Sequence, residues 1–209
     1  MKSLYIQTRC LDSKTAESDW LNPYKSEVFA CYIQRERGNQ IAIMPAGAKG
    51  VVLPHTDIII CENEVELLKK IWDTLKTLDI GQKEQTVTYN GRKFAAPFLY
   101  TRSFLNQVPA GNTELLRDRY KTVSEHLDLI EALTFHHISQ GAPLLDLATH
   151  FKLPIPTIIE GEPLSQIINT AIATKSPQLW ELIAKSGTTY AGITLEIAKI
   201  WGSTLRAVY

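Results

Sequence analysis

The sequence has few cysteines, no net charge and no long apolar segment. Its three cysteines, Cys10, Cys31 and Cys61, form no CxxC pair, which argues against a thiolate zinc site or a disulfide framework. Twenty-two Lys and Arg residues balance 22 Asp and Glu residues. This balance is unlike that of a protein that holds nucleic acid by bulk charge, but it permits a local basic groove. No apolar run approaches the about 20 residues that span a bilayer, and no signal-peptide core is present, so we expect a cytoplasmic protein.

The N-terminal half has the apolar patterns of strands, and the 209 residues suit a single domain over 1–209. A strand over 27–34 is apolar on both alternating faces, as a central strand covered on two sides would be. The turn residues 37–40 predict a hairpin to the next strand. The expected strands cover residues 3–7, 27–34, 41–44, 57–61 and 86–89.

Helices are predicted after the fourth strand and throughout the C-terminal half. Asn63 is a suitable N-cap, and Glu66 stands three residues on, where it can reach back to the amide of the cap. Pro97 suits the first turn of a second helix. The remaining helices are expected near 127–135, 144–151, 164–174 and 178–201, separated by prolines. Strands followed by helices predict an α/β fold, a mixed sheet flanked by helices with a helical C-terminal half.

The segment Thr88–Leu99, which reads TYNGRKFAAPFL, is the most informative part of the chain. It resembles the second motif of the DEDD 3′–5′ exonucleases, in particular proteins related to the proofreading domain of family B DNA polymerases. Arg117–Tyr120, His126–Leu129, the Leu144–Pro154 region and the Ala184–Trp201 helix resemble further elements of that family. The resemblance implies an RNase H-like fold and an activity in which two metal ions, held by four carboxylates, hydrolyse the terminal phosphodiester.

The carboxylates that the resemblance requires are missing at the positions it assigns. Ile6 and Thr8 stand where the first motif has its two acids, and Ala95 stands where the second motif has its aspartate. Ser186 and Tyr190 stand at the two places of the third motif. Because Mg²⁺ prefers oxygen ligands with carboxylate charge, we expect no metal and no cofactor at these degenerate positions.

Other candidates for chemistry are weaker. His136 and His137 are adjacent, so on a helix they point about 100° apart and cannot chelate one metal ion together. Gly47–Gly50 is too short for a phosphate-binding loop, and it lacks the following Ser or Thr. Asp128 is predicted to be a framework residue of the family, although a catalytic role remains an alternative.

Basic and aromatic residues around the second motif are candidates for nucleic-acid binding. Basic side chains position a phosphate backbone, and tyrosines stack on bases. A solvated surface with ion pairs to Glu114 and Asp118 is an equally good interpretation. The candidate residues are Asn90, Arg92, Lys93, Tyr100, Arg102, Arg117, Arg119, Tyr120 and Lys121.

The sequence therefore leads to one main hypothesis and two alternatives. The main one is a catalytically inactive exonuclease-like domain that binds a single strand or a duplex end, of DNA or RNA, or other subunits of a nucleic-acid-processing complex. The first alternative is a protein–protein scaffold without nucleic-acid contact, which the neutral charge favours. The second is an active metal-dependent exonuclease whose acids have moved, for example to Asp12, Asp57 and Asp128.

Overall fold

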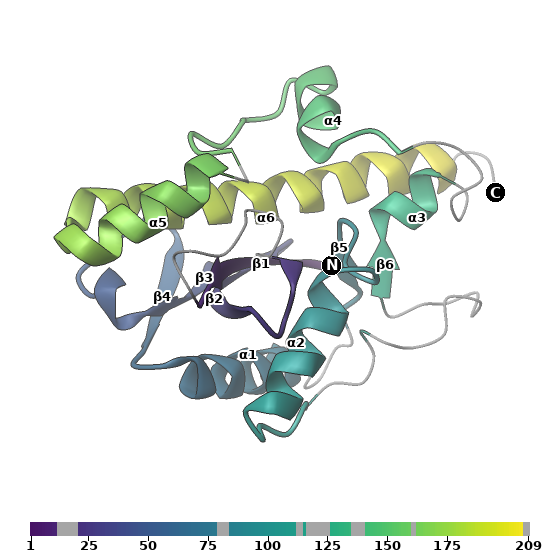
Figure 1. Cartoon of the computed structure of the whole chain (residues 1–209). Helices are drawn as coiled ribbons and strands as arrows, with labels where there is room; N and C mark the ends of the chain where they lie inside the picture. The colour runs from purple at the N-terminus through teal and green to yellow at the C-terminus, as the bar shows by residue number, and fades with distance from the viewer. Residues whose placement is uncertain are drawn as a thin grey trace.

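Six strands form one mixed sheet in the computed structural model, in the order β4-β3-β2-β1-β5-β6 (Figure 1). The structure describes residues 1–11, 21–78, 84–111, 115, 126–134, 141–159 and 162–206. The strands are β1 (Lys2–Cys10), β2 (Ser26–Arg35), β3 (Gln40–Pro45), β4 (Thr56–Cys61), β5 (Thr86–Thr88) and β6 (His126–Asp128). The first three are antiparallel neighbours, and β4, β5 and β6 join the sheet in parallel pairs.

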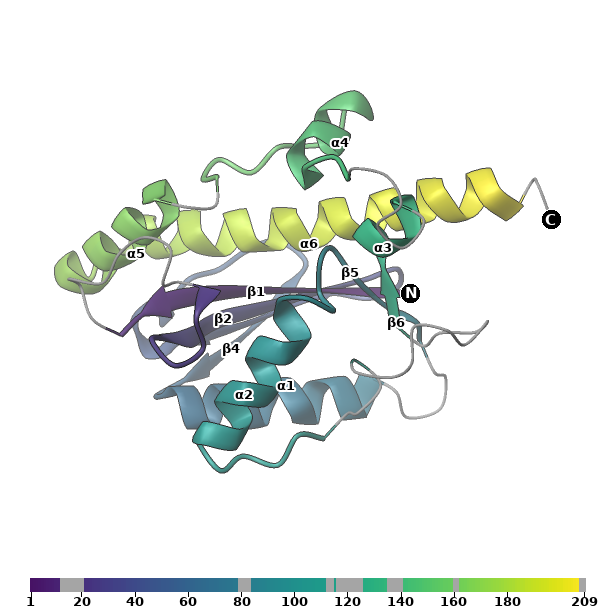
Figure 2. The same ribbon diagram turned by 45° about the vertical axis from the view of Figure 1, so that its right-hand side comes forward.

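Helices cover both faces of the sheet. The helices α1 and α2 lie on one face, and α5 and the long α6 lie on the other, where α6 runs along the sheet (Figures 1 and 2). A short turn of 3-10 helix over Ala46–Ala48 follows β3. The helices are α1 (Glu64–Leu78), α2 (Ala95–Leu105), α3 (Leu129–Leu133), α4 (Leu144–His150), α5 (Glu162–Thr174) and α6 (Pro177–Arg206). In the described part of the chain, no helix is long and apolar enough to cross a membrane.

The central strand β2 divides two hydrophobic cores. Val28, Cys31 and Ile33 pack with α1 and α2, whereas Phe29 and Tyr32 pack with α5 and α6. Both sets of side chains are at most 3% exposed, so β2 is buried on both faces, as its doubly apolar sequence predicts. A third core joins β5 to α3, α4 and the C-terminal half of α6.

Local signals at the start of α1 act nearly as predicted. The Asn63 side chain accepts a hydrogen bond from the Glu66 amide at 3.0 Å. The Glu66 carboxylate accepts one from the amide of Glu62 at 2.8 Å, one residue before the expected position. The predicted hairpin between β2 and β3 is confirmed by their antiparallel register.

The predicted helix over 127–135 is wrong at its beginning. His126–Asp128 instead form β6, which pairs in parallel with β5. The helix α3 begins only at Leu129, because the Asp128 side chain caps it by accepting from the Ile130 amide. A three-residue edge strand has too weak a local pattern to separate it from a helix, and its pairing partner is distant in the sequence.

The close approach of α6 to β2 gives a test of the packing. A Cβ added at Gly187 would collide with the Tyr32 ring, whereas one added at Gly192 in the same helix would have no described heavy atom within 4 Å. We expect Gly187→Ala to lower the free energy of unfolding by about 2 kcal/mol or more through overpacking. Gly192→Ala should raise it by about 1 kcal/mol through helix propensity. Urea denaturation of both variants measures the difference, and equal midpoints would contradict this packing.

Candidate nucleic-acid cleft

The Asn-Gly turn of the second motif connects β5 to α2. Asn90 has a φ of 58°, a left-handed conformation that asparagine tolerates. A Cβ at Gly91 would collide with the Thr88 side chain, so the turn requires glycine at that position. The Asn90 carbonyl accepts from the Phe94 amide at 3.0 Å. The tight strand-to-helix turn predicted from the sequence is therefore present.

The carboxylate of Asp128 holds this turn from the neighbouring strand β6. One oxygen, Oδ1, accepts from the Asn90 amide at 2.9 Å, and Oδ2 accepts from the Arg92 amide at 2.8 Å. Oδ1 also accepts from the Ile130 amide at 3.2 Å. Burial raises the pKa of Asp128, while the three amide hydrogen bonds act in the opposite direction. The arrangement supports the framework role predicted for Asp128.

Two further contacts join β5, β6 and the turn. The Arg92 guanidinium donates to the His126 carbonyl at 2.8 Å and pairs with the buried Glu131 at 3.1 Å. The His126 ring contacts the Thr88 hydroxyl at 2.7 Å and the Leu115 carbonyl at 3.0 Å. We name the set formed by Thr88, Arg92, His126, Asp128 and Glu131 the β6 brace. In this brace Arg92 serves to hold the turn, not to present a charge at the surface.

A cleft of about 640 Å³ lies beside the turn. It is bounded by β1, the turn, the start of α4 and the middle of α6, and it is mostly apolar and aromatic. Tyr5 and Tyr190 both line it and stack on each other with ring centroids 4.8 Å apart. Its described lining is Leu4, Tyr5, Ile6, Leu21, Tyr89, Asn90, Lys93, Phe94, Ala95, Ile130, Pro143, Leu144, Leu145, Asp146, Ile159, Tyr190 and Thr194.

Three of the five degenerate positions meet at this cleft. Ile6, Ala95 and Tyr190 come from β1, α2 and α6, and all three line it. Thr8 is half-buried beyond a register shift of β1 and is not part of the described lining. Ser186 lies one turn before Tyr190 and donates its hydroxyl to the Ile158 carbonyl at 2.7 Å.

The candidate binding residues separate into three groups. Asn90 and the exposed Lys93 border the cleft. Tyr100 packs on Trp72 with ring centroids 5.2 Å apart, and Arg102 is buried in an ion pair with Glu64. Arg92 and Arg102 do not present their charges on one basic surface, since each pairs with its own buried acid. Arg117, Arg119, Tyr120 and Lys121 lie outside the described residues.

Several residues of the cleft were not predicted from the sequence. Tyr89 donates its hydroxyl to the Ala142 carbonyl, and burial with the nearby charges of Asp128 and Asp146 raises its pKa to about 12. Tyr89 therefore stays a neutral donor at neutral pH. Tyr5 precedes Ile6 and Tyr89 precedes Asn90, two residues that were predicted from the sequence to belong to the site. This adjacency could have indicated Tyr5 and Tyr89 as well. The cleft residues at the start of α4, Pro143–Asp146, are not next to any predicted site residue.

The cleft does not fit a pair of metal ions. Of its described lining residues, only Asp146 carries a carboxylate, and Ile6 and Ala95 offer no side-chain oxygen. A two-metal centre requires several hard oxygen ligands. Nowhere in the described ranges do three or more His, Cys, Asp or Glu side chains form a group that could hold a metal ion.

The fold resembles that of a solved DNA polymerase, and the sequence matches a family of predicted exonucleases. The chain is similar to the structure of the family B DNA polymerase from the hyperthermophilic archaeon Pyrobaculum calidifontis, with a TM-score of 0.64 and 15% sequence identity. The match covers 95% of this chain and 24% of the polymerase chain, so this protein spans about a quarter of the polymerase's length. The predicted RNase H-like fold, a mixed sheet flanked by helices, is confirmed.

A family model agrees with this structural similarity. The model of predicted 3′–5′ exonucleases related to the exonuclease domain of PolB matches residues 55–171, more than half of the chain. The chain therefore belongs to this family. No curated protein sequence matches it.

Replacing Asp128 tests the brace. Asp128→Asn removes the charge and puts an NH₂ group beside backbone N–H donors, so we expect the free energy of unfolding to fall by roughly 3 kcal/mol. Asp146→Asn is the control, since Asp146 is exposed. Urea denaturation measures both, and equal losses in the two variants would contradict the brace.

The buried His126 predicts a pH dependence of stability. Burial, with a smaller contribution from the charge of Arg92, lowers its pKa from 6.5 to about 4. Between these values the unfolded chain takes up a proton that the folded chain refuses, so stability falls as the pH falls, by about 3 kcal/mol over the window. Urea midpoints between pH 7 and 5 should therefore depend less on pH in His126→Gln. His150→Gln, at an exposed position, should keep the wild-type slope; an unchanged slope in His126→Gln would refute the assignment.

Proposed function

We propose that this protein binds the end of a single nucleic-acid strand in the cleft and does not hydrolyse it. In this function it is a binding subunit of a nucleic-acid-processing assembly. One observation carries the proposal: Ile6, Ala95 and Tyr190, the positions where the resemblance requires carboxylates, line one cleft that Lys93 borders. The cleft keeps its place in the fold, but its described surface has exchanged acids for apolar and aromatic groups.

The lining suits a nucleobase. The half-buried Tyr5 and Phe94 offer aromatic surface, with the buried Tyr190 stacked on Tyr5, and the volume of about 640 Å³ is within the range of small-molecule sites. Stacking on aromatic side chains is favourable for every base, which makes such binding tolerant of sequence. Tyr89 and Asn90 add polar groups at the rim.

The charge of the cleft supports binding of a phosphate. Lys93 is exposed, precedes Ala95 by two residues in the turn before α2 and lines the same cleft. A carboxylate at position 95 would repel a phosphate in the absence of a metal ion, and alanine removes that repulsion. Lys93 can then contact the backbone directly, which positions a strand without reading its sequence.

The alternative of a nuclease with relocated acids loses support from the geometry. Asp57 belongs to β4 and Asp128 to β6, the two opposite edges of the sheet. Asp128 also uses its carboxylate for three backbone amides. These two acids cannot serve the same pair of metal ions; Asp12 lies outside the described residues.

Fluorescence anisotropy of labelled single-stranded DNA and RNA tests the proposal. We expect binding that persists in EDTA, weakens as salt rises and gives a signal that stays constant in Mn²⁺. Lys93→Gln should weaken binding and reduce the slope of log affinity against log salt by about 0.7, the value for one phosphate contact with a single strand. Lys69→Gln, an exposed lysine on α1, should leave both unchanged.

Three outcomes would overturn the proposal. A signal that falls with time in Mn²⁺ but not in EDTA would identify an active nuclease. Absence of binding at low salt would leave the protein–protein scaffold. Binding that Lys93→Gln and Lys69→Gln weaken equally would place the nucleic acid elsewhere on the surface.

A further inference from the structure

The edge strand β4 has a neighbour on one side only. It pairs with β3, and no described strand lies on its other side (Figure 1). The parallel ladder with β3 runs over all six residues of β4 without a register shift. Such an edge presents a row of backbone N–H and C=O groups with which another strand can pair.

Alternate residues of β4 direct these backbone groups outward. The Gln40 amide of β3 donates to the His55 carbonyl at 2.9 Å, and Gln40 stands opposite Thr56 in the register. In a parallel ladder this bond assigns the backbone groups of the odd-numbered residues of β4 to β3. The backbone groups of Thr56, Ile58 and Ile60 therefore point away from β3.

The strand β4 has few of the features that protect an exposed edge. It contains no lysine, no proline and no bulge, and Asp57 is its only charged residue. Ile58, Ile59 and Ile60 are half-buried, so part of each side chain remains at the surface. A regular, apolar edge without such protection is a place where a second strand adds to a sheet.

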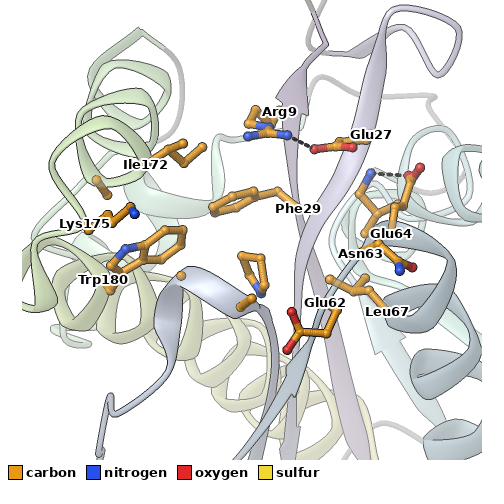
Figure 3. Close-up of a pocket in the computed structure, with 15 residues that line it drawn as sticks. Arg9, Glu27, Phe29, Glu62, Asn63, Glu64, Leu67, Ile172, Lys175 and Trp180 are labelled. Atoms are coloured by element: carbon orange, nitrogen blue, oxygen red, sulfur yellow. Dashed lines mark hydrogen bonds and ion pairs between the residues drawn. The ribbon is translucent and has the colours of Figure 1, made fainter.

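The structure sets both ends of this edge. His55 has a φ of 54°, a left-handed conformation that ends the extended backbone before Thr56. After Cys61 the chain enters α1, and the Glu62 amide donates to the Glu66 carboxylate at 2.8 Å. A second hollow, of about 680 Å³, lies beyond this point at the ends of β3 and β4 (Figure 3). A partner strand thus has three outward-facing residues of β4 to pair with.

We propose that β4 pairs in antiparallel register with β4 of a second copy of this chain, with the two-fold axis at Ile58. This register matches all three outward-facing residues, because Ile58 pairs with its own copy and Thr56 pairs with Ile60. Each matched pair exchanges two backbone hydrogen bonds. The two sheets become one continuous sheet with the α1 helices of both copies on the same face.

The side chains of β4 favour this register over the nearest alternatives. Asp57 stands opposite Ile59 of the second copy, so no two like charges are directly opposed. A two-fold axis at Asp57 would place two carboxylates opposite each other. An axis at Ile59 would match only Ile58 with Ile60 and leave Thr56 without a partner.

A second β4 is a better partner than the opposite edge of the sheet. The strand β6 has only three residues, and contact between β4 and β6 would be head-to-tail, which produces rings or open chains. Two-fold pairing of β4 closes after two copies. The pairing is independent of the proposed strand binding, because no residue of β4 lines the cleft.

Analytical ultracentrifugation of the full chain tests the pairing. We expect a mass that rises with protein concentration from that of a monomer to that of a dimer. Ile58→Pro removes the N–H at the two-fold axis from both copies and should weaken the dimer at least about tenfold. Ile58→Ala is the matched control, because it shortens the same side chain but keeps the N–H, so it should weaken the dimer less.

Hydrogen exchange of single amides gives a test that needs no substitution. The amides of Ile58 and Ile60 face outward, so their exchange should slow as the protein concentration rises. The Ile59 amide belongs to the ladder with β3 and should be protected at every concentration. Exchange at Ile58 and Ile60 that does not depend on concentration would contradict the proposed pairing.

A charge placed on the axis assigns the dimer to this edge. Ile58→Lys would oppose two ammonium groups directly and should abolish the dimer. Phe104→Lys is the control, since Phe104 is an apolar residue of α2 that is 81% exposed, and it should leave the dimer unchanged.

Several results would overturn the proposal. These are a monomer at every concentration, assemblies larger than a dimer, equal dimer affinity of Ile58→Pro and Ile58→Ala, and a dimer that Phe104→Lys disrupts. Thermal melting of each variant separates a lost contact from a lost fold. Binding of the labelled strand should be the same in Ile58→Pro and in the wild type, so failure of the dimer and failure of the cleft are distinguishable.

Discussion

The carboxylate of Asp128 is the contact on which the candidate cleft depends. It stands at the end of a three-residue edge strand, which has few ladder hydrogen bonds to hold it. The same side chain begins α3 and accepts two amides of the turn that precedes α2. Burial raises the pKa of Asp128 and so disfavours its ionised form. The amides that point at it favour that ionised form.

The brace fixes the turn beside the cleft through residues other than those at the centre of the cleft lining. The turn is held from behind by Asp128, and Arg92 meets Glu131 on the same side. None of these contacts uses Ile6, Ala95 or Tyr190. The residues that hold the turn in place are therefore different from Ile6, Ala95 and Tyr190, which line the cleft. Ile6, Ala95 and Tyr190 are buried and uncharged, so they require no counter-ion in the cleft.

Three arginines of the described part of this neutral chain are used inside the fold. Arg9, Arg92 and Arg102 each pair with a glutamate, namely Glu27, Glu131 and Glu64. The guanidinium group suits such buried pairs because it is planar and offers several donors. The lysines Lys93 and Lys175 remain exposed, one at each hollow. A count of basic residues near a motif does not distinguish buried, ion-paired arginines from exposed lysines that are available to a ligand.

The sequence by itself determined the strands of the N-terminal half, the capped helix α1 and the Asn-Gly turn, because each depends on residues close together in the chain. The family followed from several such local motifs along the chain. The sequence also predicted that Ile6, Thr8, Ala95, Ser186 and Tyr190 belong to one site, and three of them, Ile6, Ala95 and Tyr190, line the cleft. Only the tertiary structure decided that β6 is a strand, that Arg92 and Arg102 are paired, and that Tyr5 and Tyr89 face the cleft. These features depend on partners far apart in the sequence, such as Asp128 with Asn90 or Arg102 with Glu64. A local pattern carries no information on which distant acid a base will meet.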